Sequence, residues 1–176
     1  MSITFNKPTL ADVEEIARVH VQCWQESYAS ILPVEFLRNL SVDAKIEQWR
    51  RTISDPQVFN LVASEAGRIL GFVSCGSARE GAGKGADGEV LAIYILKAYY
   101  GRKIGRALIS AAARFWLSKG GRNLIVLSMA GNSQAAAFYQ ALGGIQVYEG
   151  SFEIADTVIA DKGHLFNNLV ELAACA

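Results

Sequence analysis

The fold is decided by the stretch EVLAIYILKAYYGRKIGRALISAAARFW, which runs from Glu89 to Trp116. Its apolar run, Val90 to Leu96, predicts a buried strand that leads into a turn holding Gly101 and Gly105. An amphipathic helix is then expected over about residues 102–119. Amide groups at a helix N-terminus have no intrahelical partner, and the helix dipole favours negative charge there. This strand–turn–helix unit therefore predicts a site for a phosphate or pyrophosphate group.

Charge is unevenly distributed around this stretch. The 176 residues carry 17 basic and 17 acidic side chains, so the formal net charge is zero. Residues 90–148 nevertheless hold seven basic residues and no acid, whereas residues 1–89 carry −3 and residues 149–176 carry −4. A zero net charge argues against a general nucleic-acid binder, which usually has a basic excess. The local surplus instead predicts that one segment of an otherwise acidic protein binds an anion.

Length and composition restrict the class of protein. A chain of 176 residues that is 51% hydrophobic and 19% charged predicts a single domain, residues 1–176, with a sizeable core. The longest apolar run is far shorter than the ~20 residues that span a bilayer, and the N-terminus lacks a secretion signal. The three cysteines are scattered and never form a C-x-x-C pair. We expect a cytoplasmic protein without a metal site, a membrane anchor or a nucleic-acid partner.

Strands and helices alternate in the middle of the chain, and antiparallel hairpins are expected at either end. This order predicts an α/β or α+β domain with a mixed sheet. Thr9 with Asp12, Pro33 and Ser41 mark the starts of three helices before the central stretch. The glycine-rich segment 77–88, which includes the fragment GAGKGADG, predicts a mobile loop. Strands are predicted at 3–5, 58–64, 68–75, 89–96 and 123–129, a further helix at 133–142, and two or three strands near 145–152, 154–160 and 164–172.

The turn after the central strand lacks both the dinucleotide fingerprint G-x-G-x-x-G and the Walker pattern. It resembles the acetyl-CoA-binding motif Q/R-x-x-G-x-G/A of the GNAT N-acetyltransferase superfamily, with Tyr100-Gly101-Arg102-Lys103-Ile104-Gly105 as the matching residues. Tyr100 stands in place of Gln or Arg, and Lys103 in place of the first Gly. A main-chain amide remains at both positions, and Lys103 adds a charge provided that its conformation does not require a positive φ.

A second segment resembles the other signature of the same superfamily, N-x-x-A-x-x-F-Y-x-x-x-G. It runs from Asn132 through Phe138 and Tyr139 to Gly143 and lies on the next strand–helix unit. The resemblance implies a GNAT-type fold, which is a mixed, mostly antiparallel central sheet flanked by helices. It further implies acetyl-CoA as the acyl donor, bound where two central strands splay apart.

The resemblance assigns cofactor contacts to two groups of residues. Main-chain groups of Ile93, Tyr94 and Ile95 would meet the pantetheine arm and the thioester oxygen, as an added strand does. The pyrophosphate would be held by the turn, and Asn132 would contact the cofactor while capping the following helix. For each basic residue a solvated helix face is the alternative, and for Asn132 capping alone. The turn residues are Gly101, Arg102, Lys103, Ile104, Gly105 and Arg106.

Acetyl transfer to an amine requires a base for the ammonium proton and an acid for the leaving thiolate. Glu89 starts the central strand, where many GNAT enzymes carry a catalytic carboxylate, and is the candidate base; a rim carboxylate that solvates the strand end is the alternative. Tyr139 matches the aromatic position whose hydroxyl lies near the cofactor sulfur, and is the candidate acid; a packing aromatic beside Phe138 is the alternative.

The acceptor site is expected near the first long helix, where GNAT enzymes usually shape it. Trp24 and Tyr28 are the candidate acceptor-binding residues, although Trp24 shares an apolar face with His20, which favours a core role for both. His164 has no metal-ligand partner at useful spacing and is interpreted as an end-of-strand residue. The segment HVQCWQESYASILPVEFLRNLS resembles a subgroup of bacterial GNAT proteins.

The leading hypothesis is an acetyl-CoA-dependent N-acetyltransferase that acts on a primary amine of a small molecule. The N-terminus of a peptide or protein is the rival acceptor. A non-catalytic acyl-CoA-binding regulatory module is an alternative of another class, because both departures from the pattern lie in the cofactor motif. A purely structural domain would require both signatures to be coincidental. A homodimer is an open alternative to a monomer.

Overall fold

The computed structural model describes residues 2–81 and 85–175. The predicted loop at 77–88, and within it the fragment from Gly81 to Gly88, falls partly outside the described residues, at positions 82–84. In chain order the elements are β1 (Thr4–Asn6), the 3-10 turn η1 (Leu10–Asp12), α1 (Val13–Tyr28), α2 (Val34–Arg38), α3 (Val42–Ser54), β2 (Phe59–Glu65), β3 (Arg68–Ser77), β4 (Gly88–Ile95), the 3-10 turn η2 (Lys97–Tyr99), α4 (Ile104–Ser118), β5 (Leu124–Met129), α5 (Ser133–Ala141), β6 (Ile145–Ile154), β7 (Thr157–Phe166) and α6 (Leu169–Ala174).

The strands form one seven-stranded sheet in the order β1-β2-β3-β4-β5-β7-β6. Each neighbouring pair is antiparallel except β4 and β5, which confirms a mixed, mostly antiparallel sheet. β4 and β5 pair only from Gly88 to Val90, although β4 continues to Ile95 and β5 to Met129. The two strands therefore diverge over most of their length, so that the β5-facing edge of β4 keeps peptide groups without a strand partner.

A β-bulge lies at the point where β4 leaves β5. Ser74 of β3 is opposite Ala92, and the next residue, Cys75, is opposite Val90, so Leu91 has no partner of its own. A bulge changes which face the following side chains occupy. Val90 accordingly packs in the cluster beneath α4, whereas Ala92 packs in the cluster beneath α1 and α3.

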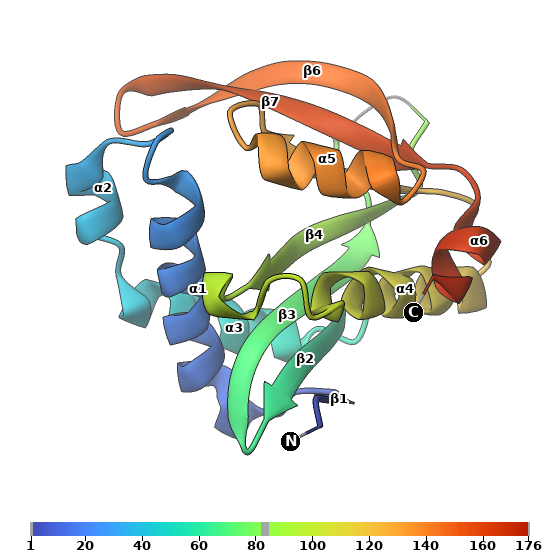
Figure 1. Ribbon diagram of the computed structural model, residues 1–176, viewed down its shortest axis with the longest axis horizontal. Helices are drawn as coiled ribbons and strands as arrows, with labels where there is room; N and C mark the ends of the chain where they lie inside the picture. The colour runs from blue at the N-terminus through green and yellow to red at the C-terminus, as the bar shows by residue number, and fades with distance from the viewer. Residues whose placement is uncertain (1, 82–84, 176) are drawn as a thin grey trace.

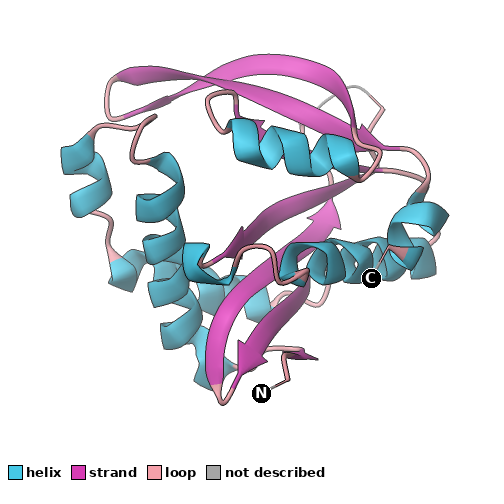
Figure 2. Ribbon diagram, viewed as in Figure 1, coloured by secondary structure: helices cyan, strands magenta, loops and turns pink. Residues whose placement is uncertain are grey.

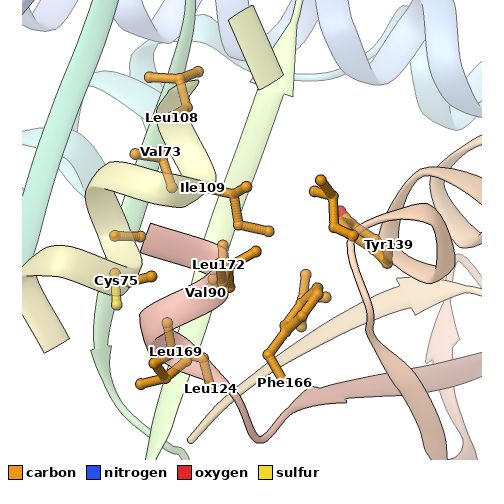
Figure 3. Close-up of a cluster of buried hydrophobic side chains, with 14 of the residues drawn as sticks. Val73, Cys75, Val90, Leu108, Ile109, Leu124, Tyr139, Phe166, Leu169 and Leu172 are labelled. Carbon is orange, nitrogen blue, oxygen red and sulfur yellow. The ribbon is translucent and has the colours of Figure 1, made fainter. Parts of the chain in front are cut away.

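Helices cover both faces of the sheet (Figures 1 and 2). α4 and α5 lie on the face turned toward the viewer, and α3 lies behind β3. Figure 3 shows the larger core cluster, in which Tyr139 and Phe166 approach from the side opposite to Leu108 and Val73. A second cluster on the other face joins α1 and α3 to the sheet through Trp49 and Phe72.

Short-range signals placed the helix starts correctly. Thr9 and Asp12 form the predicted capping box, and Ser41 accepts a hydrogen bond from the Ala44 amide. Pro33 directly precedes α2. Asn132 accepts a hydrogen bond from the Ala135 amide at the start of α5. Each of these bonds satisfies an amide that the helix itself leaves free.

The last predicted strand, at 164–172, is wrong beyond Phe166. Residues Leu169–Ala174 form helix α6, which the Asn168 side chain caps by accepting from the Glu171 amide. Leu169 and Leu172, three residues apart, lie on the buried face of this helix and join the cluster beneath α4. The spacing of these two leucines and the Asn168 cap are helical signals in the sequence that the strand prediction overlooked.

No helix in the described ranges has the length and apolar character needed to cross a membrane.

Candidate functional site

A cleft of about 440 Å³ occupies the space opened by the divergence of β4 and β5. It crosses the sheet, because its wall includes Ile93 and Ile95, which pack toward α4, and Tyr94, which packs toward α1 and α3. The volume is within the ~300–1,000 Å³ typical of sites for small ligands. Eleven of the residues predicted for the site line this cleft: Tyr28, Ile93, Tyr94, Ile95, Gly101, Lys103, Ile104, Gly105, Arg106, Asn132 and Tyr139.

One end of the cleft is the N-terminus of α4. The first intrahelical hydrogen bond runs from the Ala107 amide to the Lys103 carbonyl, so the amides of Ile104, Gly105 and Arg106 have no acceptor within the helix. Lys103 is the N-cap residue, and its side chain does not cap. An uncapped helix N-terminus that opens into a cleft is suited to an anion.

Lys103 adopts a left-handed conformation, with φ 61° and ψ 8°. The condition that this residue avoid a positive φ is therefore not met. For a residue other than glycine this conformation costs roughly 1–2 kcal/mol. A cation at a helix N-terminus is also unfavourable to the helix dipole. Lys103 thus opposes stability in two ways at a position that lines the cleft, which is the pattern expected of a residue retained for binding.

The basic side chains of the turn divide into two groups. Lys103 and Arg106 line the cleft, whereas Arg102 is not among its lining residues. The Arg102 guanidinium donates to the Glu65 carboxylate, with Nη2 2.7 Å from Oε1, and lies over the Tyr99 ring. The structure therefore brings two of the three predicted charges together at the cleft and directs the third toward the β2–β3 hairpin.

Three tyrosines meet inside the cleft. The hydroxyls of Tyr28 and Tyr94 are 2.9 Å apart and share a hydrogen bond. The Tyr139 hydroxyl makes no hydrogen bond within the part of the chain that the structure describes, and the ring packs against His164. Burial raises the pKa of all three tyrosines, most strongly for Tyr94 and Tyr139. The three hydroxyls therefore keep their protons at neutral pH and are able to donate a hydrogen bond.

Glu89 does not line the cleft. Its side chain is 0% exposed, and its carboxylate is held by Arg79. The Arg79 amide donates to Oε2 at 3.0 Å, Nε donates to both oxygens at 3.1 Å, and Nη2 donates to Oε1. Hydrogen bonding to Glu89 raises the pKa of Arg79. Glu89 is thus a buried and paired carboxylate at the point where β4 and β5 still pair.

A second, smaller pocket of about 230 Å³ lies against β4 on the α1 and α3 side of the sheet. It shares Leu91 and Ala92, the residues of the bulge, with the cleft. His20 lines it and accepts a hydrogen bond at Nδ1 from Trp49. Burial, with a smaller contribution from Lys45, lowers the pKa of His20 to about 3, so the imidazole is neutral. The remaining lining residues are Gln48, Trp49, Thr52, Ser74 and Arg79.

The two predicted acceptor residues have different surroundings. Tyr28 lines the cleft, and its hydroxyl shares a hydrogen bond with that of Tyr94. Trp24 lies between the rings of His20 and Tyr28, with Lys45 over its face at 5.1 Å, and lines neither the cleft nor the second pocket. The core interpretation of Trp24 therefore has the better support.

Sequence reasoning missed three residues near the site. Glu26 is the one acid among the described residues that line the cleft, and its carboxylate accepts from the Lys97 amide at 2.8 Å. Arg79 is the partner of Glu89. His164 is not at a strand end but fully buried within β7, against Tyr139. Glu26 lies two residues before Tyr28, which is not a same-face helical spacing, and the contacts of Glu26, Arg79 and His164 are tertiary, so no short-range signal identified them.

Comparisons of sequence agree with this geometry. The model of the Acetyltransferase (GNAT) family matches residues 14–144. The uncharacterized N-acetyltransferase YuaI of Bacillus subtilis is 34% identical over 161 residues, which cover 92% of this chain and 91% of YuaI. The spermidine N(1)-acetyltransferase of Thermoplasma acidophilum is 24% identical, over 89% of this chain and 92% of that protein.

Solved structures share the fold at lower identity. The PaiA N-acetyltransferase of Thermoplasma acidophilum, solved in complex with coenzyme A, superposes with a TM-score of 0.69 at 21% identity, over 92% of this chain and 98% of that one. YncA of Salmonella typhimurium, solved with acetyl-CoA, superposes with a TM-score of 0.73 at 17% identity, over 95% and 94% of the two chains.

Proposed function

This chain belongs to the GNAT family of acetyltransferases, and from that premise we propose that the N-acetyltransferase acts on a primary amine of a small molecule. Acetyl-CoA is the acyl donor in this family and supplies an activated thioester whose carbonyl carbon an amine can attack. The acceptor, the roles of individual residues, a cytoplasmic location and a homodimer are the open questions. The acceptor is the part for which the described residues offer the most specific support.

The cleft fits the donor. CoA carries a diphosphate, and the uncapped N-terminus of α4 with Lys103 and Arg106 is suited to that anion. Ile93 and Ile95 lie on β4 beyond its last pair with β5, so their peptide groups are available to an extended arm in the manner of an added strand. These residues would hold the donor through main-chain groups. Tyr100 and Lys103 keep their main-chain amides, so their departure from the acetyl-CoA-binding motif is compatible with donor binding.

The observation that carries the small-molecule proposal is the second pocket. It is about 230 Å³, and side chains of α1, α3 and β3 line it, as His20, Trp49 and Ser74 illustrate. A polypeptide acceptor would need an extended groove or a strand edge other than the free edge of β4, which is assigned to the donor arm. Glu26 is the one acid among the described residues of the cleft wall, which also holds Lys97, Lys103 and Arg106, so charge at the cleft does not decide the acceptor class. The relation to a spermidine acetyltransferase supports a small-molecule acceptor.

Tyr139 is proposed as the acid. The residue is 5% exposed and lines the cleft, and its hydroxyl has a raised pKa and makes no hydrogen bond among the described residues. As the amine nitrogen bonds to the carbonyl carbon and the C–S bond breaks, Tyr139 Oη would give its proton to the leaving thiolate. Glu89 stays the proposed base, and that role requires the Arg79 side chain to leave the carboxylate.

The experiment is a thiol-release assay with acetyl-CoA and a panel of amines, run beside calorimetry with acetyl-CoA. The panel contains alkyl diamines, polyamines, amino acids and peptides with free N-termini. We expect turnover on at least one small amine and none on the peptides. Faster turnover on peptides would overturn the small-molecule proposal, and acetyl-CoA binding without turnover on any amine would favour a regulatory module.

A further inference from the structure

The Glu89 carboxylate is buried, but its counter-ion is mostly in water. The Glu89 side chain is 0% exposed, whereas that of Arg79 is 63% exposed. Arg79 follows β3 by two residues and reaches back to Glu89 with its amide, Nε and Nη2. The guanidinium thus binds the carboxylate along its Nε–Nη2 edge, while most of the surface of the Arg79 side chain meets solvent. The ion pair is not part of the donor cleft, because neither residue lines it.

In this ion pair the anion is buried and the cation is largely exposed. A buried ionised carboxylate cannot be left unpaired without a large penalty, so Glu89 requires a positive partner for as long as it is ionised. The arginine side chain, in contrast, loses conformational freedom when it is held and recovers hydration when it is released. An incoming cation could therefore replace the guanidinium with little net change in charge, whereas a neutral molecule could not.

The second pocket provides the place from which such a cation would arrive. Arg79 lines this pocket and Glu89 does not, so the pocket reaches the counter-ion of the carboxylate rather than the carboxylate itself. Ser74 also lines it, is 2% exposed, and its Oγ has no hydrogen-bond partner among the described residues. A buried hydroxyl without a partner is costly unless a ligand pairs with it. The ring of Trp49 offers an apolar wall for an alkyl chain.

We propose that an alkylammonium group of the acceptor and the Arg79 guanidinium are alternative partners of Glu89, so that the acceptor enters the second pocket by displacing Arg79. The ammonium would donate to the carboxylate and to Ser74 Oγ, and its alkyl chain would lie on Trp49. This inference rests on the proposed function, since it specifies the subsite for a cationic small molecule. A carboxylate ligand is the competing occupant, because Arg79 Nη1 faces no acceptor among the described residues, but such a ligand would leave the ion pair intact.

The first experiment observes Arg79 in the wild-type protein. The Nε–H resonance of Arg79 in nitrogen-15-labelled protein is followed while 1,4-diaminobutane is added without acetyl-CoA, at constant ionic strength. We expect a saturable shift toward the position of free arginine and faster exchange of the proton with water. Neutral 1,4-butanediol should have no effect. A resonance that diaminobutane leaves unmoved would overturn the proposal, as would one that responds to butanoate instead.

The second experiment measures diaminobutane affinity by calorimetry in two matched variants. Arg79→Lys keeps a cation but loses the forked hydrogen bonds, so the internal partner competes less and the Kd should fall by about tenfold. Arg38→Lys alters an equally exposed arginine, paired with Glu35 at a distant helix, and should leave the Kd unchanged. Equal affinities in the two variants would refute the exchange. Neither experiment involves turnover. If diaminobutane displaces Arg79 but no amine is acetylated, the proposed small-molecule acceptor is wrong while the exchange at Glu89 stands.

Discussion

Substitutions at Lys103, the residue proposed to bind the anion, can measure how much folding stability its charge and its backbone conformation cost. Lys103 has φ 61°, caps α4 without a side-chain bond, and lines the cleft beside three free amides. Two substitutions separate its effects. Lys103→Ala removes the charge and keeps the left-handed strain, whereas Lys103→Gly removes both. Comparison of the two variants isolates the backbone contribution from the charge.

The magnitudes follow from the geometry. Removing a cation from a helix N-terminus stabilises the fold by about 0.3–1 kcal/mol, which both variants should show. Glycine relieves about 1–2 kcal/mol of left-handed strain but gives back about 0.4–1 kcal/mol through the freedom of the unfolded chain. Lys103→Gly should therefore exceed Lys103→Ala by about 0.5–1 kcal/mol. For a chain of this length, each kcal/mol of added stability raises Tm by about 2–4 °C.

The assay combines urea unfolding with calorimetry of acetyl-CoA binding. Both variants should bind acetyl-CoA less tightly by a similar factor, about threefold to tenfold, because both lose the same charge beside the anion site. If Lys103→Gly is no more stable than Lys103→Ala, the strain argument fails. If both variants keep wild-type affinity, Lys103 does not serve the anion, and its unfavourable position has another cause.

Three further predictions address the chemistry and the second pocket. Tyr139→Phe should lower the single-turnover rate by about 100-fold, as expected for loss of a general acid, while the acetyl-CoA Kd stays within about twofold; unchanged kinetics would refute the acid role. Glu89→Gln should lower turnover at saturating amine, and a variant with full turnover there would exclude Glu89 as the base. The pKa of His20 is about 3 in the folded protein against 6.5 in the unfolded chain, so unfolded chains take up the proton first and stability is lost as pH falls below about 6.5. This loss should approach about 1.4 kcal/mol per pH unit in urea unfolding and should be absent in His20→Gln, whose amide oxygen can still accept from Trp49; an identical pH dependence in both proteins would contradict it.

The local parts of the molecule were predictable from the sequence. Helix caps at Thr9, Ser41 and Asn132 depend on residues three positions away, and the structure contains all three. The strand–turn–helix unit of the candidate anion site was identified for the same reason. The conformation of Lys103 was not predictable, because a positive φ at a residue other than glycine follows from the path that the surrounding fold imposes.

Contacts between distant segments explain why the environment of Glu89 was not predicted from the sequence, and they also support the helix α6. Glu89 appeared as a free carboxylate at a strand start, yet Arg79 binds it from the far end of a loop. α6 was mistaken for a strand although Asn168 and the spacing of Leu169 and Leu172 are helical signals. With six residues this helix depends on its contacts with α4: Ser110 Oγ donates to the Leu172 carbonyl at 2.7 Å, and Arg114 donates to the Ala173 carbonyl.

The electrostatic effect of the central segment, residues 90–148, also depends on contacts with distant segments. Residues 90–148 carry seven basic side chains and no acid, but acids from other segments neutralise part of this surplus. Glu65 pairs with Arg102, and Asp87 pairs with Arg122. The basic residues that line the cleft are Lys97, Lys103 and Arg106, opposed by Glu26. The field at the cleft is thus weaker than the sequence count implies. Affinity for an anion must then depend more on the fixed amides at the start of α4 than on the long-range charge, and salt should weaken acetyl-CoA binding only modestly.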